Sequence, residues 1–217
     1  MMFTGFCLKD KKLEIKKFVL KFLDVNCYLL KYKNSSFLID PGSEFKRIKD
    51  YIIKNNIKLD FILNTHGHYD HTGAVADLVR EFKVPFYIHE KEDEIIEDPK
   101  KNLSSFFSSN ELLLQTCTLI SKETEDNFLN LGITIMNFAG HTPGSVIIKI
   151  EDNLFTGDVL FKGSIGRTDL PCGSSRKMSE SLKIIKSFDK NLKIFPGHGP
   201  ESSMKDELEN NYFLRSL

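Results

Sequence analysis

Apolar residues recur along the chain at two spacings, one typical of strands and one typical of helices. Short runs rich in apolar and β-branched residues, bounded by Asp, Asn, Ser or Gly, indicate strands. In the first half we expect strands at 13–22, 26–32, 36–39, 61–63 and 84–88. The apolar residues between Val75 and Phe82 recur at i, i+3, i+4 and i+7, the spacing of a helix with one buried face. Further helices are expected at 44–55 and 91–97.

The second half restarts the same pattern. Strands are expected at 133–138, 145–150, 153–155 and 192–195, and helices at 176–188 and 204–213. Residues 99–115 show no clear spacing. Two halves that each run from strands to helices predict an α/β (α+β) fold, with two sheets packed face to face and helices outside. A chain of 217 residues leaves little room for a second unit, so we expect a single domain over residues 1–217.

Composition and charge narrow the range of partners. Apolar residues make up 41% and charged residues 28%, as in ordinary globular proteins. Basic and acidic residues are equal at 30 each, so no net field attracts nucleic acid or anionic lipid. No export signal or membrane-spanning run is visible, and the scattered cysteines suit reduced thiols. We therefore expect a cytoplasmic protein that binds neither nucleic acid nor membranes.

The strongest chemical signal is the segment THGHYDHTG at residues 65–73, which places three histidines and one aspartate in one loop after an expected strand. Neutral imidazoles and carboxylates are the ligands of zinc and similar borderline metals. On extended backbone His66, His68 and Asp70 would project to one side. A turn would then bring His71 back toward the same cavity. This pattern predicts a metal site at the end of the strand.

Three further candidate ligands also lie just beyond expected strands. His141 occurs in AGHTPGS, Asp158 in FTGDVLF and His198 in PGHGP. A rigid sheet can aim loop residues of this kind into one site. Five of the 6 histidines fall in such motif-like loops. Isolated surface histidines would not be concentrated in this way. The sixth, His89 in FYIHEKE, has no ligand-rich neighbours and is expected to be structural.

These residues form an ordered series that resembles the five motifs of the metallo-β-lactamase superfamily, over nearly the whole chain. The series consists of Asp40, the H-x-H-x-D-H motif at 66–71, His141, Asp158 and His198. The segments GHTPGS, TGDVLFKGSIGRTDLP and PGHGP resemble the glyoxalase II-like, or hydroxyacylglutathione hydrolase-like, branch, especially its short single-domain members. The resemblance implies a four-layer αββα sandwich with two mixed sheets.

The resemblance also implies two divalent metal ions, with Zn²⁺ favoured and Fe or Mn as alternatives. The first ion would be held by His66, His68 and His141, the second by Asp70, His71 and His198, and Asp158 would bridge them. Asp40 would orient the motif loop from behind the ligands. Two ions roughly 3.5–4 Å apart can generate a hydroxide near neutral pH and polarise a carbonyl, so no side-chain nucleophile is required.

The implied reaction is hydrolysis of a small-molecule thioester, S-2-hydroxyacylglutathione such as S-lactoylglutathione. The metal-bridging hydroxide, oriented by Asp70, would attack the carbonyl and a thiolate would leave. Arg167 in the IGRTD loop closely follows Asp158 and is expected to help hold an anionic substrate. Cys172, in DLPCG, has no visible base beside it and is not expected to be a nucleophile.

Other activities share part of this pattern. Persulfide dioxygenases also carry a GRTD loop and use one iron on residues that match His66, His141 and Asp158. A lactonase is a third alternative. True metallo-β-lactamases commonly have cysteine at the position of Asp158, which argues against antibiotic hydrolysis as the main task. A nucleic-acid binding or processing module is disfavoured by the neutral charge. Full-length glyoxalase II adds a helical domain that contacts glutathione, whereas about nineteen residues follow His198 here.

Overall fold

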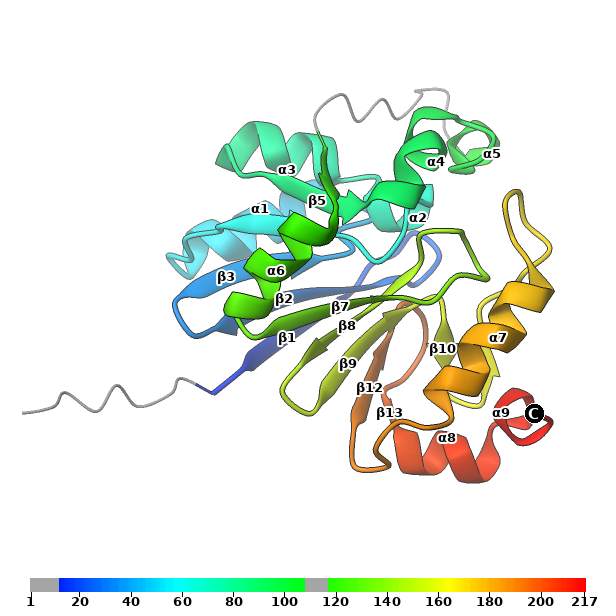
Figure 1. Cartoon of the computed structure of the whole chain (residues 1–217). Coiled ribbons are helices and arrows are strands. Elements are labelled where there is room, and N and C mark those ends of the chain that lie inside the picture. Colours follow the sequence, from blue (N-terminus) through cyan, green and yellow to red (C-terminus); the bar gives the residue numbers. More distant parts are fainter. Residues whose placement is uncertain (1–11, 108–116) are drawn as a thin grey trace, which may run out of the picture.

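Two sheets form the centre of the molecule, and helices cover the outer face of each (Figure 1). The computed structural model describes residues 12–107 and 117–217. The first sheet has the order β1-β2-β3-β4-β5-β6, and its strands are β1 (Glu14–Val19), β2 (Asn26–Tyr32), β3 (Ser35–Ile39), β4 (Phe61–Leu63), β5 (Phe86–His89) and β6 (Thr118–Ile120). Strands β1 to β3 pair antiparallel, and β3 to β6 pair parallel. The sheet is therefore mixed, as expected.

The second sheet is also mixed and has the order β13-β12-β9-β8-β7. Its strands are β7 (Ile133–Asn137), β8 (Val146–Ile150), β9 (Asn153–Gly157), β12 (Lys193–Pro196) and β13 (Ser202–Ser203). Only β12 and β9 pair parallel among these strands. A separate hairpin follows β9 and consists of β10 (Leu160–Phe161) and β11 (Ser164–Ile165).

Helices lie on both outer faces of the pair of sheets (Figure 1). The first sheet is covered by α1 (Phe45–Lys54) and α3 (Val75–Phe82). The second sheet is covered by α7 (Ser175–Ile185), α8 (Met204–Asn210) and α9 (Tyr212–Arg215). The other helices are α2 (Tyr69–Thr72), the 3₁₀ turn η1 (Glu90–Glu92), α4 (Asp93–Glu97), α5 (Ser104–Phe107) and α6 (Lys122–Asn130). The four-layer αββα arrangement predicted from the sequence is confirmed.

Alternation along the strands explains why four layers form. Successive side chains of a strand point to opposite faces, so a strand with apolar residues at every position is buried on both sides. In β2, Leu29 packs toward α1 and α3 whereas Leu30 packs between the two sheets. In β8, Ile147 faces α7 whereas Ile148 faces the first sheet. Each central strand thus contributes to two hydrophobic clusters.

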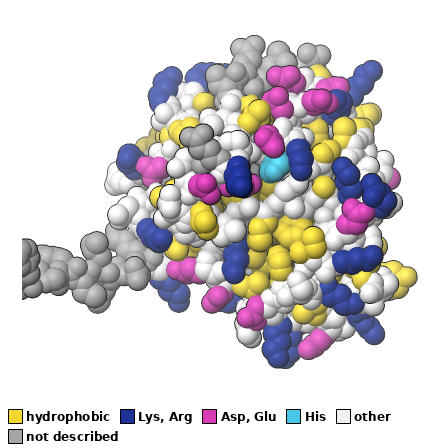
Figure 2. All heavy atoms as spheres, in the orientation of Figure 1, with side chains coloured by type: hydrophobic (Ala, Val, Ile, Leu, Met, Phe, Trp, Pro, Cys, Tyr) yellow, Lys and Arg dark blue, Asp and Glu magenta, His cyan; other side chains and the backbone are white. Residues whose placement is uncertain are grey.

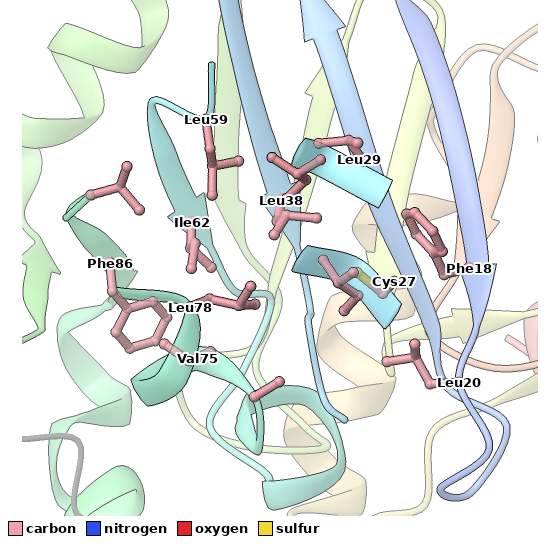
Figure 3. Packing of buried hydrophobic residues seen from close by; sticks show 14 of the residues in the cluster. Phe18, Leu20, Cys27, Leu29, Leu38, Leu59, Ile62, Val75, Leu78 and Phe86 are labelled. Atoms are coloured by element: carbon pink, nitrogen blue, oxygen red, sulfur yellow. The ribbon is translucent and has the colours of Figure 1, made fainter. Parts of the chain in front are cut away.

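The cluster beneath α1 and α3 is drawn in Figure 3. Side chains from the sheet, such as Leu38 and Ile62, meet Val75 and Leu78 of α3. All four are fully buried. Truncating one such side chain to Ala costs about 2–5 kcal/mol of stability, because apolar surface is lost and a cavity remains. This packing holds β4 rigid, and the histidine-rich loop begins directly after β4.

The structure differs from the sequence expectations mainly at element ends and in short elements. The strand expected at 13–22 ends at Val19, because the turn that follows holds Leu23 and Asp24 in left-handed backbone. The helix expected at 204–213 is two helices, since the Asn211 side chain accepts the backbone N–H of Phe213 and starts α9. β6, α6 and the β10–β11 hairpin were not predicted. Within 99–115, α5 is present and residues 108–116 lie outside the described part.

The surface shows mixed charge and no membrane-spanning element in the described part of the chain. On the face drawn in Figure 2, Lys and Arg side chains are interspersed with Asp and Glu, and hydrophobic side chains gather between them. No helix among residues 12–107 and 117–217 is long and apolar enough to cross a bilayer. Cys27, Cys117 and Cys172 are free thiols, whereas Cys7 lies outside the described residues.

Candidate metal centre

All predicted ligand residues come from loops at the same end of the two sheets. The segment that carries His66 to His71 follows β4, Asp158 follows β9 and His198 follows β12, while the loop with His141 lies between β7 and β8. Asp40 follows β3 directly. Strands β3 and β4 of the first sheet and β7, β9 and β12 of the second therefore end around one cavity. The structure brings together all seven predicted ligands.

The first ligand group consists of His66, His68 and His141, whose ligand atoms lie within 4.8 Å of one another. His68 Nδ1 and His141 Nε2 are 2.9 Å apart. His141 Nδ1 lies 2.8 Å from the carbonyl oxygen of Arg167, which can only accept, so Nδ1 carries the proton and Nε2 keeps its lone pair for the cavity. His66 Nε2 is buried and has no hydrogen-bond partner among the described residues.

The second group consists of Asp70, His71 and His198. His71 Nε2 lies 3.3 Å from His198 Nε2, which in turn lies 3.4 Å from Asp70 Oδ2. His198 Nδ1 donates to the carbonyl oxygen of Leu23 at 3.0 Å, so its Nε2 also offers a lone pair. Outer hydrogen bonds of this kind fix the tautomer of a ligating histidine.

Asp158 lies between the two groups. Its Oδ1 is 3.3 Å from His71 Nε2, and its Oδ2 is 3.5 Å from the Nε2 atoms of both His141 and His198. Gly197 leaves room for this carboxylate, because a Cβ there would collide with Asp158 Oδ1 and crowd the His71 ring. Asp158 thus has oxygen atoms within 3.5 Å of both groups, as a shared ligand would need.

The separations of the donor atoms of His71, His198 and Asp158 fit metal ions. Two nitrogen ligands at 2.0–2.1 Å from a tetrahedral ion are about 3.3 Å apart. The donor pairs around His71, Asp158 and His198 lie at 3.3–3.5 Å. The orphaned Nε2 of His66 is a further indication, since buried nitrogens without a partner are costly unless a cation satisfies them.

Burial and neighbouring charges favour the metal-binding protonation state at His66, His68 and Asp158. At His71 and His198 burial is outweighed by the adjacent carboxylates, which raise the pKa of both imidazoles. Burial, reinforced by His71, holds the pKa of His66 well below its usual value, and burial lowers the pKa of His68 to about 3. Burial opposes ionisation of Asp158, but the adjacent His71 outweighs it and brings the net pKa well below the usual value. Neutral imidazoles and an ionised carboxylate are the metal-binding forms.

Asp40 lies behind the candidate ligand residues. Its Oδ1 accepts the backbone N–H of Thr65 at 2.8 Å, and its Oδ2 accepts the Thr65 hydroxyl at 2.6 Å. The same Oδ2 lies 3.0 Å from His71 Nδ1. Asn64, which the sequence analysis did not single out, donates from Nδ2 to the carbonyl oxygen of His71 at 2.7 Å. The motif loop is therefore tied to the sheet at both ends.

One geometric expectation for the motif loop was wrong. Extended backbone ends at His68, and Asp70 lies in α2. The helix turn brings Asp70 and His71 to the second group, so alternation along a strand does not place them. His89 lies apart from the ligand groups, and its Nδ1 accepts the backbone N–H of Lys91 at 3.1 Å at the start of η1.

Glu92 is a residue that the sequence analysis missed. Its side chain is fully buried, and its two oxygens accept backbone N–H groups from two loops, Gly67 at 2.7 Å and Gly144 at 2.6 Å. Gly67 lies between His66 and His68 of the first group, and Gly144 lies in the loop that carries the third histidine of that group, His141. The available signal was that Glu92 shares its helix face with the buried Ile95 and Ile96, at i+3 and i+4.

Five of the seven ligand residues line an open cleft of about 800 Å³, whereas His66 and His71 are fully buried and do not line it. We call the seven residues together the floor of the cleft. Arg167 lines the cleft, and its guanidinium makes two hydrogen bonds of 2.8 Å to Asp169. Cys172 is exposed, lies outside the lining and has left-handed backbone with φ 67°, a conformation that favours glycine. The described cleft residues thus place Arg167, but not Cys172, beside the candidate site.

Comparisons with known proteins show which family this chain belongs to. A family model of the metallo-β-lactamase superfamily matches residues 20–198. Hydroxyacylglutathione hydrolase GloC of Haemophilus influenzae is 33% identical over 198 residues, covering 88% of this chain and 93% of that protein.

Two solved structures are similar over almost their whole length. The crystal structure of the BLEG-1 B3 metallo-β-lactamase has a TM-score of 0.81 and 31% identity, covering 93% of this chain and 99% of that one. The structure of TTHA1623 in a di-iron-bound form has a TM-score of 0.83 and 29% identity, covering 91% of this chain and 99% of that one. These relatives differ in what their names say they bind or hydrolyse.

Proposed function

The chain belongs to the metallo-β-lactamase superfamily, and from this premise we propose that it is a binuclear metal-dependent thioesterase that hydrolyses S-2-hydroxyacylglutathione. The observation that carries the proposal is the position of Asp158, with one oxygen near His71 and the other near both His141 and His198. A single metal site would need only one of the two groups. The hydrolase GloC supports the thioester as the substrate.

The proposed ligand assignment follows the two groups. One ion would be held by His66, His68 and His141, the second by Asp70, His71 and His198, with Asp158 shared. When bound, two divalent ions supply an activated water near neutral pH and polarise the scissile carbonyl. Zn²⁺ suits these nitrogen and oxygen donors, and a di-iron-bound relative makes iron a specific alternative.

The chain's own residues orient and prepare this chemistry. Asp40 fixes the ring of His71 through Nδ1, and the carbonyl of Arg167 fixes His141 in the same way. Asp70 faces the open cleft from the second group, where its carboxylate can orient the attacking water. Water adds to the thioester carbonyl, the C–S bond breaks and the thiolate leaves with the electron pair. Of the two protons of the water, one goes to the thiolate and one to solvent, and the acyl group leaves as a carboxylate.

The test is metal content measured together with turnover. The purified protein, loaded with Zn²⁺ or Fe²⁺, should bind two ions per chain and release thiol from S-lactoylglutathione without oxygen. A panel of lactones and β-lactams should be hydrolysed more slowly. Oxygen uptake with glutathione persulfide and one iron per chain would instead select the persulfide dioxygenase, and a faster lactone or β-lactam would replace the thioester in the proposal.

A further inference from the structure

The walls of the cleft are chemically unlike its floor. Above the ligand residues, the lining consists mostly of apolar side chains that come from separate parts of the chain. They include Leu23 after β1, Phe106 and Phe107 of α5, Phe161 of β10 and Ile165 of β11. We call these five residues the apolar rim.

The apolar rim reaches the ligand residues directly. The ring of Phe161 packs edge to face on the ring of His198, with centroids 5.9 Å apart. Leu23 accepts the Nδ1 proton of the same histidine through its carbonyl oxygen, and its backbone is held in the left-handed region at φ 54°. An apolar side chain is therefore fixed beside the candidate metal centre, at a position where strained backbone must be supported by its surroundings.

One aromatic residue of α5, Phe107, is anchored to the motif loop through Phe22. The ring of Phe107 packs edge to face on Phe22 at 5.3 Å, and Phe22 packs on Tyr69 at 5.7 Å. Phe106 and Phe107 are nevertheless 70% and 50% exposed. Large apolar side chains that stay in water gain free energy when an apolar ligand covers them.

The cleft offers little to a charged substrate group. Among the described lining residues, Arg167 is the only Lys or Arg. Both of its hydrogen bonds at 2.8 Å go to Asp169, and its hydrogen bonds lower the pKa of that carboxyl to about 2. An anionic peptide carrier would have to compete with Asp169 for this guanidinium.

We infer that the preferred substrates of this site carry an aliphatic or aromatic acyl group that packs against the apolar rim, and that the thiol carrier contributes less to binding. This inference rests on the proposed thioesterase function and names its substrate class. Each methylene moved from water to an apolar surface favours binding by about two- to fourfold, depending on how fully it is covered. Remote binding of this kind can raise kcat/KM without changing the chemistry at the carbonyl.

The experiment compares thioesters that share one thiol and one 2-hydroxyl group. With the metal-loaded protein, kcat/KM should be roughly tenfold or more higher for S-2-hydroxyhexanoylglutathione than for S-lactoylglutathione, and S-mandeloylglutathione should be similarly favoured. Phe106→Ala should reduce the hexanoyl-to-lactoyl ratio by about threefold or more. Leu129→Ala removes an apolar side chain of similar exposure, 58%, from α6 outside the cleft lining and should leave the ratio unchanged.

Equilibrium binding separates failure of this inference from failure of the proposed function. Calorimetry with S-methylglutathione and S-hexylglutathione, which cannot be hydrolysed, should show at least about tenfold tighter binding of the hexyl compound. Hydrolysis of all thioesters with equal kcat/KM would overturn the inference and keep the thioesterase. No thioester hydrolysis by a protein that holds two metals would overturn the thioesterase, and equal binding of the two S-alkyl compounds would then overturn the apolar rim as well.

Discussion

The floor of the cleft consists of polar side chains that are buried and held by fixed partners, whereas the apolar rim consists of large hydrophobic side chains that remain partly in water. His71 on the floor contacts Asp40 on one side and Asp158 on the other. Phe106 on the rim is 70% exposed. A residue of the floor must therefore hold one fixed position, whereas a residue of the rim needs only to be apolar and to lie close to the substrate. The difference separates the residues that perform the chemistry from those that select the substrate.

The largest effect is expected from removing the residue that both ligand groups share. Asp158→Ala should lower the occupancy of both metal sites and reduce thioester turnover by more than about a hundredfold, because each ion loses a charged ligand. Metal content per chain and kcat measure these effects. The matched control is His89→Ala, which removes a buried histidine outside the ligand groups and should change neither. Two tightly bound metals and full activity in Asp158→Ala would show that the metal ligands have been assigned wrongly.

The next effect concerns the residue that joins two floor loops. In Glu92→Gln, one of the two N–H donors, from Gly67 or Gly144, would face an amide NH₂ in place of an oxygen. We expect metal affinity to fall by about 10- to 100-fold, as is typical when a partner behind the ligands is lost. Glu94→Gln, which alters an exposed carboxylate on α4, is the control. Competition with a chromophoric chelator gives the metal affinity of each variant. Equal affinities for Glu92→Gln and Glu94→Gln would show that Glu92 does not position the loops.

A smaller effect is expected at the edge of the rim. Arg167→Ala should raise KM, or lower kcat/KM, for glutathione thioesters by up to about tenfold, the ~1.4 kcal/mol of one modest charged contact, without loss of metal. The His141 contact survives the substitution because it uses the backbone carbonyl of residue 167. Arg176→Ala, which breaks an exposed ion pair with Glu180 on α7, serves as the control. A loss of metal in Arg167→Ala alone would show instead that this side chain supports the metal ligands.

Glu92 also predicts a pH dependence of stability, which is an effect on folding and not on turnover. Burial raises the pKa of Glu92 from 4.5 to about 7. The folded protein therefore binds this proton more tightly than the unfolded chain does, and the resulting stabilisation is complete below pH 4.5 and disappears as pH rises through about 7. From pH 5 to 7.5 the Tm of the metal-free protein should fall more than that of Glu92→Gln, which has no proton to lose there. Parallel Tm curves would exclude the titration of Glu92 in this range.

The sequence predicted the floor far better than the rim, for a physical reason. Metal ligands are few residue types at constrained spacings, so His66, His68 and His71 are visible as a pattern within one loop. The strands that hold them were visible because strands buried on both faces are almost wholly apolar. Glu92 was not recognised because its partners are backbone groups of distant loops, whose approach depends on the folded chain.

The rim has no pattern of its own. Leu23, Phe106 and Phe161 lie in three unconnected segments, and each is an unremarkable apolar residue until the fold brings them to one cleft. The same holds for short elements such as β10 and β11, whose two-residue strands carry no periodicity to detect. The turn in the motif loop was expected only after Asp70, because the four residues of α2 are too few to show helical spacing.

The division of the ligands between the two sheets has a mechanical consequence. Asp70 and His71 come from the first half of the chain, whereas His198 and Asp158 come from the second, so each bound ion would bridge the two layers. Such an ion closes a loop of chain in the way that a covalent cross-link does, and its binding energy adds to the cohesion of the native state. Chelation would then do more than stop turnover. It would weaken the attachment of the two sheets to each other, so that resistance to heat and proteases would depend on metal occupancy.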